Sequence, residues 1–153
     1  MIYKVPEVGE IEIKTLVFDL NGTISNHGKV IDGVVERMNK LKKSGFRLIM
    51  ITSDQRGLGE NTAESLGIEY FHAATSADKE KIILALDPMT IAAFGNARVD
   101  IGMFHHARVS IACIEGEGIH TEIFKFADIL VKSINDALDL FLDHDSFIST
   151  MKR

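Results

Sequence analysis

The sequence has little of what marks an exported or membrane-spanning chain. Its 153 residues include one cysteine, Cys113, so no disulfide can form within the chain. A single thiol is typical of a reducing compartment. Apolar runs such as Leu48 to Ile51 are far shorter than the roughly 20 residues that cross a bilayer. The N-terminal segment MIYKVPEVGE has no apolar signal core. We therefore predict a cytoplasmic protein that does not insert into membranes.

Positive charge is also scarce. The chain has 17 Lys and Arg against 22 Asp and Glu, a formal charge of −5, and no basic cluster stands out. Because nucleic acids are held largely by clustered Lys and Arg, a nucleic-acid partner is not expected. With only two prolines and no low-complexity stretch or repeat, the sequence shows no linker. What is abundant, 46% hydrophobic residues, predicts one domain over residues 1–153 with a single core.

Short apolar runs alternate with amphipathic segments along the chain. Residues 1–13 alternate apolar and polar positions around Pro6 and Gly9, which predicts an N-terminal β ribbon. Strands alternating with helices imply right-handed crossovers and a mostly parallel sheet covered on both faces, a doubly wound α/β fold. The expected strands are 16–18, 46–51, 68–71, 90–94, 109–114 and 127–131. The expected helices are 32–44, 60–66, 76–86, 98–106 and 134–142, followed by a helical turn after residue 145. Ser76 is the expected N-cap of the helix 76–86.

The first buried strand runs directly into residues 19–23, DLNGT. Ligands of doubly wound sheets sit beyond the carboxyl ends of the strands. Asp19 stands at such an end, where a carboxylate is costly unless it is paired or bound to a ligand. Gly22 allows a tight turn that brings backbone N–H groups toward an anion, and Thr23 adds a hydroxyl. This loop is therefore a candidate anion site.

Other strand ends supply complementary groups. The second strand leads to the hydroxyls of Thr52 and Ser53, and Lys79 lies near a helix start, where its ammonium joins the positive end of the helix dipole. The fourth strand leads to Asn96, with Asp100 four residues later. The combined set suits phosphoryl transfer, in which the first carboxylate attacks phosphorus, Mg²⁺ bridges carboxylates and phosphate, and Lys and Thr hold the oxygens.

Four segments carry a family resemblance. DLNGT resembles the first motif of the haloacid dehalogenase (HAD) superfamily, usually D-x-D-G-T, and IMITS resembles the second. Asp78-Lys79 resembles the third motif, and GNARVD, residues 95–100, resembles the fourth, usually G-D-x-x-x-D. The motifs stand in the family's order across residues 14–113. The order of TSDQ, SADKEK and FGNARVD looks most like the phosphorylation domain of P-type ATPases, which also exists as free-standing soluble proteins.

The resemblance implies a HAD-like Rossmannoid core with strand order 5-4-1-2-3 and the sixth strand beyond the fifth. The spacing from Asp19 to Thr52 is 33 residues and that from Thr52 to Lys79 is 27. Neither gap has room for a cap domain, so a capless member is expected. Its site then opens onto a large or extended substrate, or a neighbouring copy in a homo-oligomer supplies the lid; both arrangements stay open.

The resemblance also implies an activity. It is that of a Mg²⁺-dependent phosphohydrolase or phosphoryl-transfer domain, which forms an aspartyl-phosphate at Asp19 and acts on a phosphorylated small molecule or a phosphoprotein. The implied catalytic residues are Asp19, Asn21, Thr52 and Lys79, the implied phosphate-binding residues are Gly22, Thr23, Thr52, Ser53 and Lys79, and the implied metal ligands are Asp19, the backbone carbonyl of Asn21, Asn96 and Asp100.

Two positions depart from the family pattern. Asn21 stands where most family phosphatases have an acid/base Asp, and an amide cannot transfer a proton at neutral pH. Losing a general acid/base typically slows a reaction by about 10²–10⁴-fold, so turnover on alkyl phosphates should be poor. Asn96 stands where the family usually has a metal-binding Asp; it keeps a carbonyl oxygen but loses a charge. A catalytically silent binding or regulatory module is therefore the alternative.

Plainer roles stay open for several of these residues. Lys79 competes with Lys81, and either is also compatible with a solvated helix face. Asp100 is equally able to cap the next helix, and Thr52 to end a strand. Asp19 is also compatible with a capping or turn role.

Some polar residues outside the motifs are not expected to act. Arg56 is interpreted as an exposed loop residue and residues 115–118 as a solvated loop. His105 and His106 are neighbours on a predicted helix and should not share a face, so one metal ion bound by both is not expected. Cys113 lies in a predicted strand and should be a small buried side chain.

Overall fold

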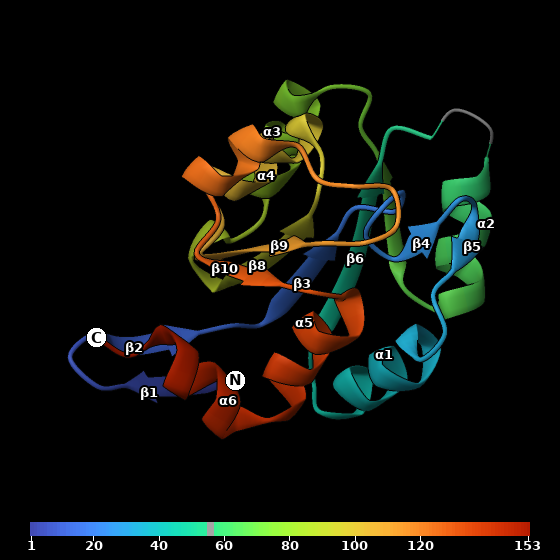
Figure 1. Ribbon diagram of the computed structural model, residues 1–153. Helices are drawn as coiled ribbons and strands as arrows, with labels where there is room; N and C mark the ends of the chain where they lie inside the picture. Colours follow the sequence, from blue (N-terminus) through green and yellow to red (C-terminus); the bar gives the residue numbers. More distant parts are fainter. Residues whose placement is uncertain (55–56) are drawn as a thin grey trace.

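A six-stranded parallel sheet forms the centre of the molecule, with helices on both faces (Figure 1). This computed structural model describes residues 1–54 and 57–153. The strand order is β10-β9-β8-β3-β6-β7, which confirms the doubly wound α/β class and the predicted order, including the sixth strand beyond the fifth. The strands are β3 (Thr15–Phe18), β6 (Arg47–Thr52), β7 (Glu69–His72), β8 (Ile91–Gly95), β9 (Val109–Cys113) and β10 (Ile129–Val131).

The central strands are buried along their whole length. Every residue of β3, β8 and β9 is buried, as expected for strands with helices on both sides. Alternate side chains of β3 enter different layers, because strand residues point to opposite faces in turn. Leu16 and Phe18 join one hydrophobic cluster and Val17 joins the other.

The helices divide between these two layers. The buried hydrophobic side chains of α1, α2, α5 and α6 belong to the cluster of Leu16, whereas those of α3 and α4 belong to the cluster of Val17. No helix among the described residues is long and apolar enough to cross a membrane. The helices are α1 (Val34–Lys43), α2 (Leu58–Leu66), α3 (Ser76–Ala85), α4 (Ile101–Phe104), α5 (Ile134–Leu142) and α6 (His144–Met151).

Two helix predictions need correction. Thr75, not Ser76, is the N-cap of α3: its side chain accepts a hydrogen bond from the Asp78 N–H at 3.1 Å, and the Asp78 carboxylate accepts one from the Thr75 N–H. The Ser76 hydroxyl instead accepts a hydrogen bond from the Gly102 N–H at 2.9 Å. The predicted helix 98–106 is a 3₁₀ turn, η2 (Arg98–Asp100), followed by the single short helix α4.

Smaller elements flank the sheet. An antiparallel ribbon of β1 (Ile2–Val5) and β2 (Gly9–Glu12) lies against α6 at the edge of the molecule (Figure 1). A second antiparallel pair, β4 (Ser25–Asn26) and β5 (Lys29–Val30), follows the DLNGT loop. Its strands are two residues long, too short for a periodic signal, and the sequence did not predict them. The remaining 3₁₀ turns are η1 (Pro88–Thr90) and η3 (Thr121–Lys125).

Candidate active site

Three charged side chains from distant parts of the sequence meet at the carboxyl edge of the sheet. The Lys79 ammonium donates hydrogen bonds to Oδ1 of Asp19 at 2.6 Å and to Oδ1 of Asp100 at 2.7 Å. Lys79 and Asp100 are fully buried, and Asp19 is 6% exposed. Lys81 is exposed, which settles which lysine reaches the site. Two carboxylates against one ammonium leave one formal negative charge in this cluster.

The capped first turn of α3 explains why Lys79 reaches Asp19 and Asp100. The Thr75–Asp78 capping box fixes the start of α3, so the first turn has a defined orientation on the sheet. Lys79 and Ile83 are the two buried residues of α3. Residues four apart lie on the same helix face, so Ile83 packs into the core while Lys79 extends toward the ends of the strands.

Burial and neighbouring charges have opposing effects on the pKa values of Asp19 and Lys79. Burial, and then the nearby Asp100 carboxylate, raise the pKa of Asp19 to about 7, although the Lys79 ammonium opposes the shift. Burial alone would lower the pKa of Lys79, but Asp100 and Asp19 outweigh it, so the pKa of Lys79 is raised. Lys79 therefore stays protonated at neutral pH. Because the cluster still has one more carboxylate than ammonium groups, a further positive charge beside Asp19 would be favourable.

Asp100 is held from both sides. Its Oδ1 binds Lys79, while its Oδ2 accepts hydrogen bonds from the backbone N–H groups of Asn96 and Ala97, both at 2.9 Å. Gly95 makes this approach feasible, because a Cβ there would lie 2.5 Å from Oδ2 of Asp100. Asp100 thus caps the start of η2 and pairs with Lys79 at once, and its role as a metal ligand stays a prediction.

Asn96 connects three segments of chain. Its Oδ1 accepts a hydrogen bond from the Thr23 hydroxyl at 3.3 Å, and its Nδ2 donates to the carbonyl of Gly118 at 2.8 Å. The chain passes so close that a Cβ at Gly22, where φ is +73°, would lie 2.2 Å from Nδ2 of Asn96. The DLNGT loop, the end of β8 and the loop after β9 are therefore braced through one amide.

Two backbone donors of the DLNGT loop are used within the protein. The Gly22 N–H donates to the carbonyl of Ser25 at 2.8 Å, and the Thr23 N–H donates to that of Leu20 at 3.3 Å. The Gly22 N–H is therefore not among the backbone groups left for an anion, because the short β4–β5 hairpin turns the chain back onto the loop. Gly22 and Thr23 shape the loop here, and their role in phosphate binding stays a prediction.

The other predicted residues lie around the same edge. Thr52 ends β6, the direct neighbour of β3, and is 1% exposed; its Oγ1 accepts a hydrogen bond from the Asp54 N–H at 3.3 Å. Ser53 follows it and is half-buried, whereas Asn21 is exposed. Arg56 lies outside the described residues.

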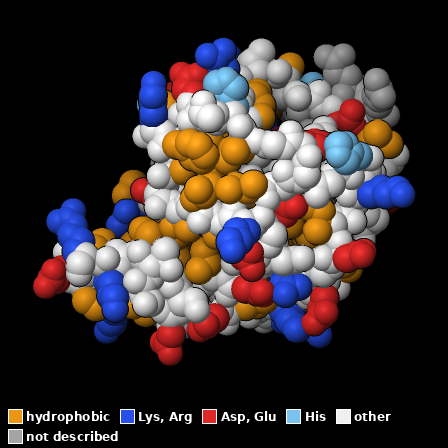
Figure 2. Space-filling view, in the orientation of Figure 1, with side chains coloured by type: hydrophobic (Ala, Val, Ile, Leu, Met, Phe, Trp, Pro, Cys, Tyr) orange, Lys and Arg blue, Asp and Glu red, His pale blue; other side chains and the backbone are white. Residues whose placement is uncertain are grey.

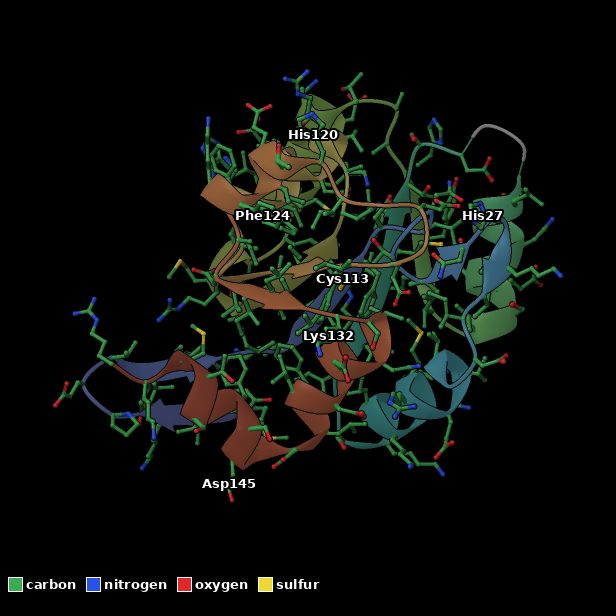
Figure 3. The ribbon with its side chains drawn as sticks, viewed as in Figure 1. His27, Cys113, His120, Phe124, Lys132 and Asp145 are labelled. Carbon is green, nitrogen blue, oxygen red and sulfur yellow. The ribbon has the colours of Figure 1, made fainter. Side chains whose placement is uncertain are left out.

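A pocket opens beside this cluster. Its volume is about 440 Å³, and it is lined by residues 96–98 and 117–120. His120 lies on its loop, at the top of the view in Figure 3. Arg98 contributes a cationic side chain, whose Nε donates to Glu122 at 2.8 Å. Asn96 belongs both to the pocket and to the hydrogen-bonded loops around Asp19, so the pocket adjoins the charged cluster.

The loop after β9 does more than face solvent. The carboxylate of Glu115 accepts hydrogen bonds from Nδ2 of Asn26 at 3.2 Å and from the Ile134 N–H at 2.6 Å. Glu117 accepts one from the N–H of His27 at 2.7 Å. These contacts tie the β4–β5 hairpin, where His27 is labelled in Figure 3, to the loop across the site. Residues 116–118 are exposed, as expected for a solvated loop, but Glu115 and Glu117 also bind the hairpin, whose partner residues are 89 and 90 positions away in sequence.

Comparisons of the sequence with known proteins give limited similarity. No protein-family model matches the chain. An uncharacterized protein of Methanocaldococcus jannaschii is 37% identical to it over 62 residues, which are 40% of this chain and 67% of that protein.

Solved structures extend the similarity over nearly the whole chain. The cobalt-bound deoxy-D-mannose-octulosonate 8-phosphate phosphatase of Haemophilus influenzae has a TM-score of 0.73 at 12% identity, covering 93% of this chain and 94% of that one. The 3-deoxy-D-manno-octulosonate 8-phosphate phosphatase of Moraxella catarrhalis, solved with magnesium, phosphate and the sugar, has a TM-score of 0.70 at 19% identity, covering 92% and 94%. A structure from Streptomyces avermitilis assigned to the HAD family of hydrolases scores 0.71 at 16% identity, covering 85% and 84%.

The strand order and these neighbours lead to one architecture. Only the β4–β5 hairpin and α1 lie between β3 and β6, and no separate domain covers the site edge among residues 1–54 and 57–153. The chain therefore has the fold of the haloacid dehalogenase superfamily, in a capless form.

Proposed function

We propose that this protein is a Mg²⁺-dependent phosphohydrolase or phosphoryl-transfer domain that forms an aspartyl-phosphate at Asp19. The observation that carries the proposal is the buried cluster of Asp19, Lys79 and Asp100 at the carboxyl edge of the sheet. A structural neighbour named as a sugar-phosphate phosphatase and solved with magnesium and phosphate supports it. The structural neighbours named as phosphatases of a phosphorylated sugar favour a phosphorylated small molecule over a phosphoprotein.

The residues present fit a magnesium ion. The cluster has one formal negative charge in excess, and burial together with the Asp100 carboxylate raises the pKa of Asp19, so a cation beside Asp19 would favour its charged form. Asp19, the backbone carbonyl of Asn21 and the amide oxygen of Asn96 offer the hard oxygen ligands that Mg²⁺ prefers. Asp100 was also predicted as a ligand; since both its oxygens already accept hydrogen bonds, we propose that it contributes charge and holds Lys79. When bound, the ion would neutralise charge on an incoming phosphate.

Each side chain then has a defined task. A carboxylate oxygen of Asp19 forms a bond to phosphorus while the bond to the leaving oxygen breaks and that oxygen keeps the electron pair. The Lys79 ammonium offsets charge on the phosphoryl oxygens, and the hydroxyls of Thr52 and Ser53 donate hydrogen bonds to them. Water then attacks phosphorus, which releases phosphate and restores the Asp19 carboxylate. Asn21, which stands in place of an acid, cannot exchange a proton with the leaving oxygen or with the water.

The direct test is to trap the covalent intermediate. The protein, with Mg²⁺, is incubated with labelled acetyl phosphate, ATP and sugar phosphates. We expect an acid-stable, hydroxylamine-sensitive label, because the missing acid/base slows its hydrolysis. The donor that labels best distinguishes a relative of the P-type ATPase phosphorylation domain, which should favour ATP, from a sugar-phosphate phosphatase.

One observation favours a second function, that of a catalytically silent binding module. Both ends of the Asn96 amide already serve as braces between loops. The same experiment decides: absence of label from every donor, together with a melting temperature that does not respond to Mg²⁺, would contradict the enzymatic proposal and favour the silent module.

Restoring the acid should raise activity. In the Asn21→Asp variant we expect turnover on alkyl phosphates to increase at least about tenfold, because general acid/base catalysis typically contributes about 10²–10⁴-fold and Asn21 is already exposed at the site edge. Steady-state phosphate release measures it. Asn21→Ser is the matched control, as it changes the side chain without adding a titratable group. Equal rates for both variants, with Mg²⁺ binding intact, would show that the missing proton carrier is not what limits turnover.

A further inference from the structure

A second group of ligand-bearing side chains lies apart from the charged cluster. Glu80 comes from α3, and His105 and His106 come from the turn that follows α4. Their potential ligand atoms all lie within 4.8 Å of one another, and Nε2 of His106 lies 2.6 Å from Oε1 of Glu80. The function proposed above uses none of these three residues.

The fold explains why sequence reasoning missed this group. Neighbouring residues within a helix point about 100° apart, which argued against a shared ligand for His105 and His106. However, α4 ends at Phe104, and both histidines lie at or beyond its end, where their side chains are free to turn toward α3. That expectation was therefore wrong about the geometry, because the predicted helix 98–106 is much shorter.

Close packing of the two helices supplies the third residue. Figure 1 shows α3 and α4 side by side on one face of the sheet. Gly102 makes the contact feasible, since a Cβ there would lie 2.0 Å from the carbonyl oxygen of Ser76. The approach puts Glu80, one helical turn along α3, beside the end of α4. The exposed ring of His105 contacts Phe126 edge-on, at 4.8 Å between centroids.

We propose that Glu80, His105 and His106 bind a divalent transition-metal ion, with Zn²⁺ as the representative. Two imidazole nitrogens and one carboxylate oxygen are a donor set that zinc accepts, with water in the fourth position. Ligands about 2.0–2.2 Å from a tetrahedral ion are roughly 3.3 Å apart, so small side-chain rotations close the group around the ion. Glu80 and His106 are half-buried and His105 is exposed, so the three side chains have space for these small rotations. Nitrogen ligands select against Mg²⁺.

Such an ion would fasten α3 to the end of α4. Lys79 directly precedes Glu80, and Asp100 directly precedes α4, so both helices carry partners of the buried cluster. Any ligand that binds only the folded protein stabilises it by mass action. Zn²⁺ should therefore raise the melting temperature of the full chain, separately from any effect of Mg²⁺.

The test is Zn²⁺ binding to the full chain in the presence of saturating Mg²⁺. Calorimetry should give one site, and imidazole NMR signals of His105 and His106 should shift while that of His72 does not. We expect Glu80→Gln, His105→Ala and His106→Ala each to weaken binding at least about tenfold, the scale by which even outer-shell changes weaken metal sites. His72→Ala, an exposed histidine on the edge strand β7, is the matched control.

Asp19→Asn distinguishes this site from the proposed active site, because it removes a magnesium ligand and should leave Zn²⁺ binding unchanged. Equal affinity in wild-type protein and the three ligand variants, or unshifted His105 and His106 signals on Zn²⁺ addition, would overturn the proposal. The His106–Glu80 contact would then be a surface hydrogen bond only.

Discussion

Replacing Lys79 by methionine should lower the free energy of unfolding by about 3–5 kcal/mol, the cost of leaving buried charges without their partner. Lys79 is fully buried and bonds to both Asp19 and Asp100, which cannot reach water easily. Methionine fills similar space but offers no positive charge. For a domain of this size, the change corresponds to a fall in melting temperature of roughly 10 °C. Thermal unfolding followed by circular dichroism measures it, and phosphoenzyme formation should disappear as well.

Lys81→Met is the matched control for this variant. Lys81 is exposed and two residues away on the same helix, so its loss should change stability by no more than about 0.5 kcal/mol. Combining Lys79→Met with Asp19→Asn should recover part of the loss, because one unpaired carboxylate is removed. If the two lysine variants were equally stable, the buried ion pairs would not have the importance assigned to them.

Replacing Asp19 by asparagine should move activity and stability in opposite directions. The variant has no nucleophile, so phosphoenzyme and turnover should fall to background. The metal-free protein, however, should gain roughly 1 kcal/mol or more, since burial and the Asp100 carboxylate both disfavour the charged form of Asp19. Melting temperature in a chelating buffer measures the gain, which is expected at about 2–4 °C per kcal/mol.

The raised pKa of Asp19 also predicts how the free energy of unfolding depends on pH. The pKa of Asp19 is about 7 in the folded protein and near the ordinary value of 3.8 when the chain is unfolded, so between these pH values the folded state binds more protons. The contribution of Asp19 to stability is therefore present below pH ~4 and is lost as the pH rises toward and through about 7, at up to about 1.4 kcal/mol per pH unit. Asp19→Asn should lack this slope.

Asp145→Asn is the control for the Asp19 variant. Asp145 is exposed and points away from the body of the protein at the bottom of Figure 3. Its variant should keep both the wild-type pH slope and wild-type labelling. A pH slope in Asp19→Asn equal to that of the wild type would mean that Asp19 is ionised in the folded protein well below neutral pH.

The fold was largely predictable because its signals are local. Runs such as Leu16 to Phe18 are apolar on both faces, and helices of expected length separate them, which together specify a parallel sheet. The meeting of Asp19, Lys79 and Asp100 was predictable for a related reason. Each lies at or near the carboxyl end of a strand or the start of a helix, and in a parallel sheet these ends share an edge.

Contacts that depend on backbone atoms or distant loops were not predictable. Asn96 binds the carbonyl of Gly118, an acceptor that every residue carries and that no motif marks. The choice between Thr75 and Ser76 as N-cap, by contrast, has a sequence signal, because Asp78 stands three residues after Thr75 as a capping box requires. The tie between Glu117 and His27 crosses 90 residues of sequence.

The exposed apolar side chains of the surface were also not predictable from the sequence. Figure 2 shows apolar side chains gathered over the region of η3, where Phe124 is labelled in Figure 3. Phe124 is 45% exposed and Leu130 on the edge strand β10 is 50% exposed. Whether an apolar side chain in a short turn faces water depends on how the turn sits on the sheet, which sequence periodicity does not report.

The spread of the charged cluster along the sequence has a consequence for how the protein can lose function. Asp19 and Lys79 are separated by 60 residues and Lys79 and Asp100 by 21, so their contacts are made by tertiary structure alone. No fragment or partly ordered intermediate lacking β3, α3 or the end of β8 retains the arrangement. Heat inactivation and cooperative global unfolding should therefore coincide, and the fraction of competent molecules at any temperature should equal the fraction that is native.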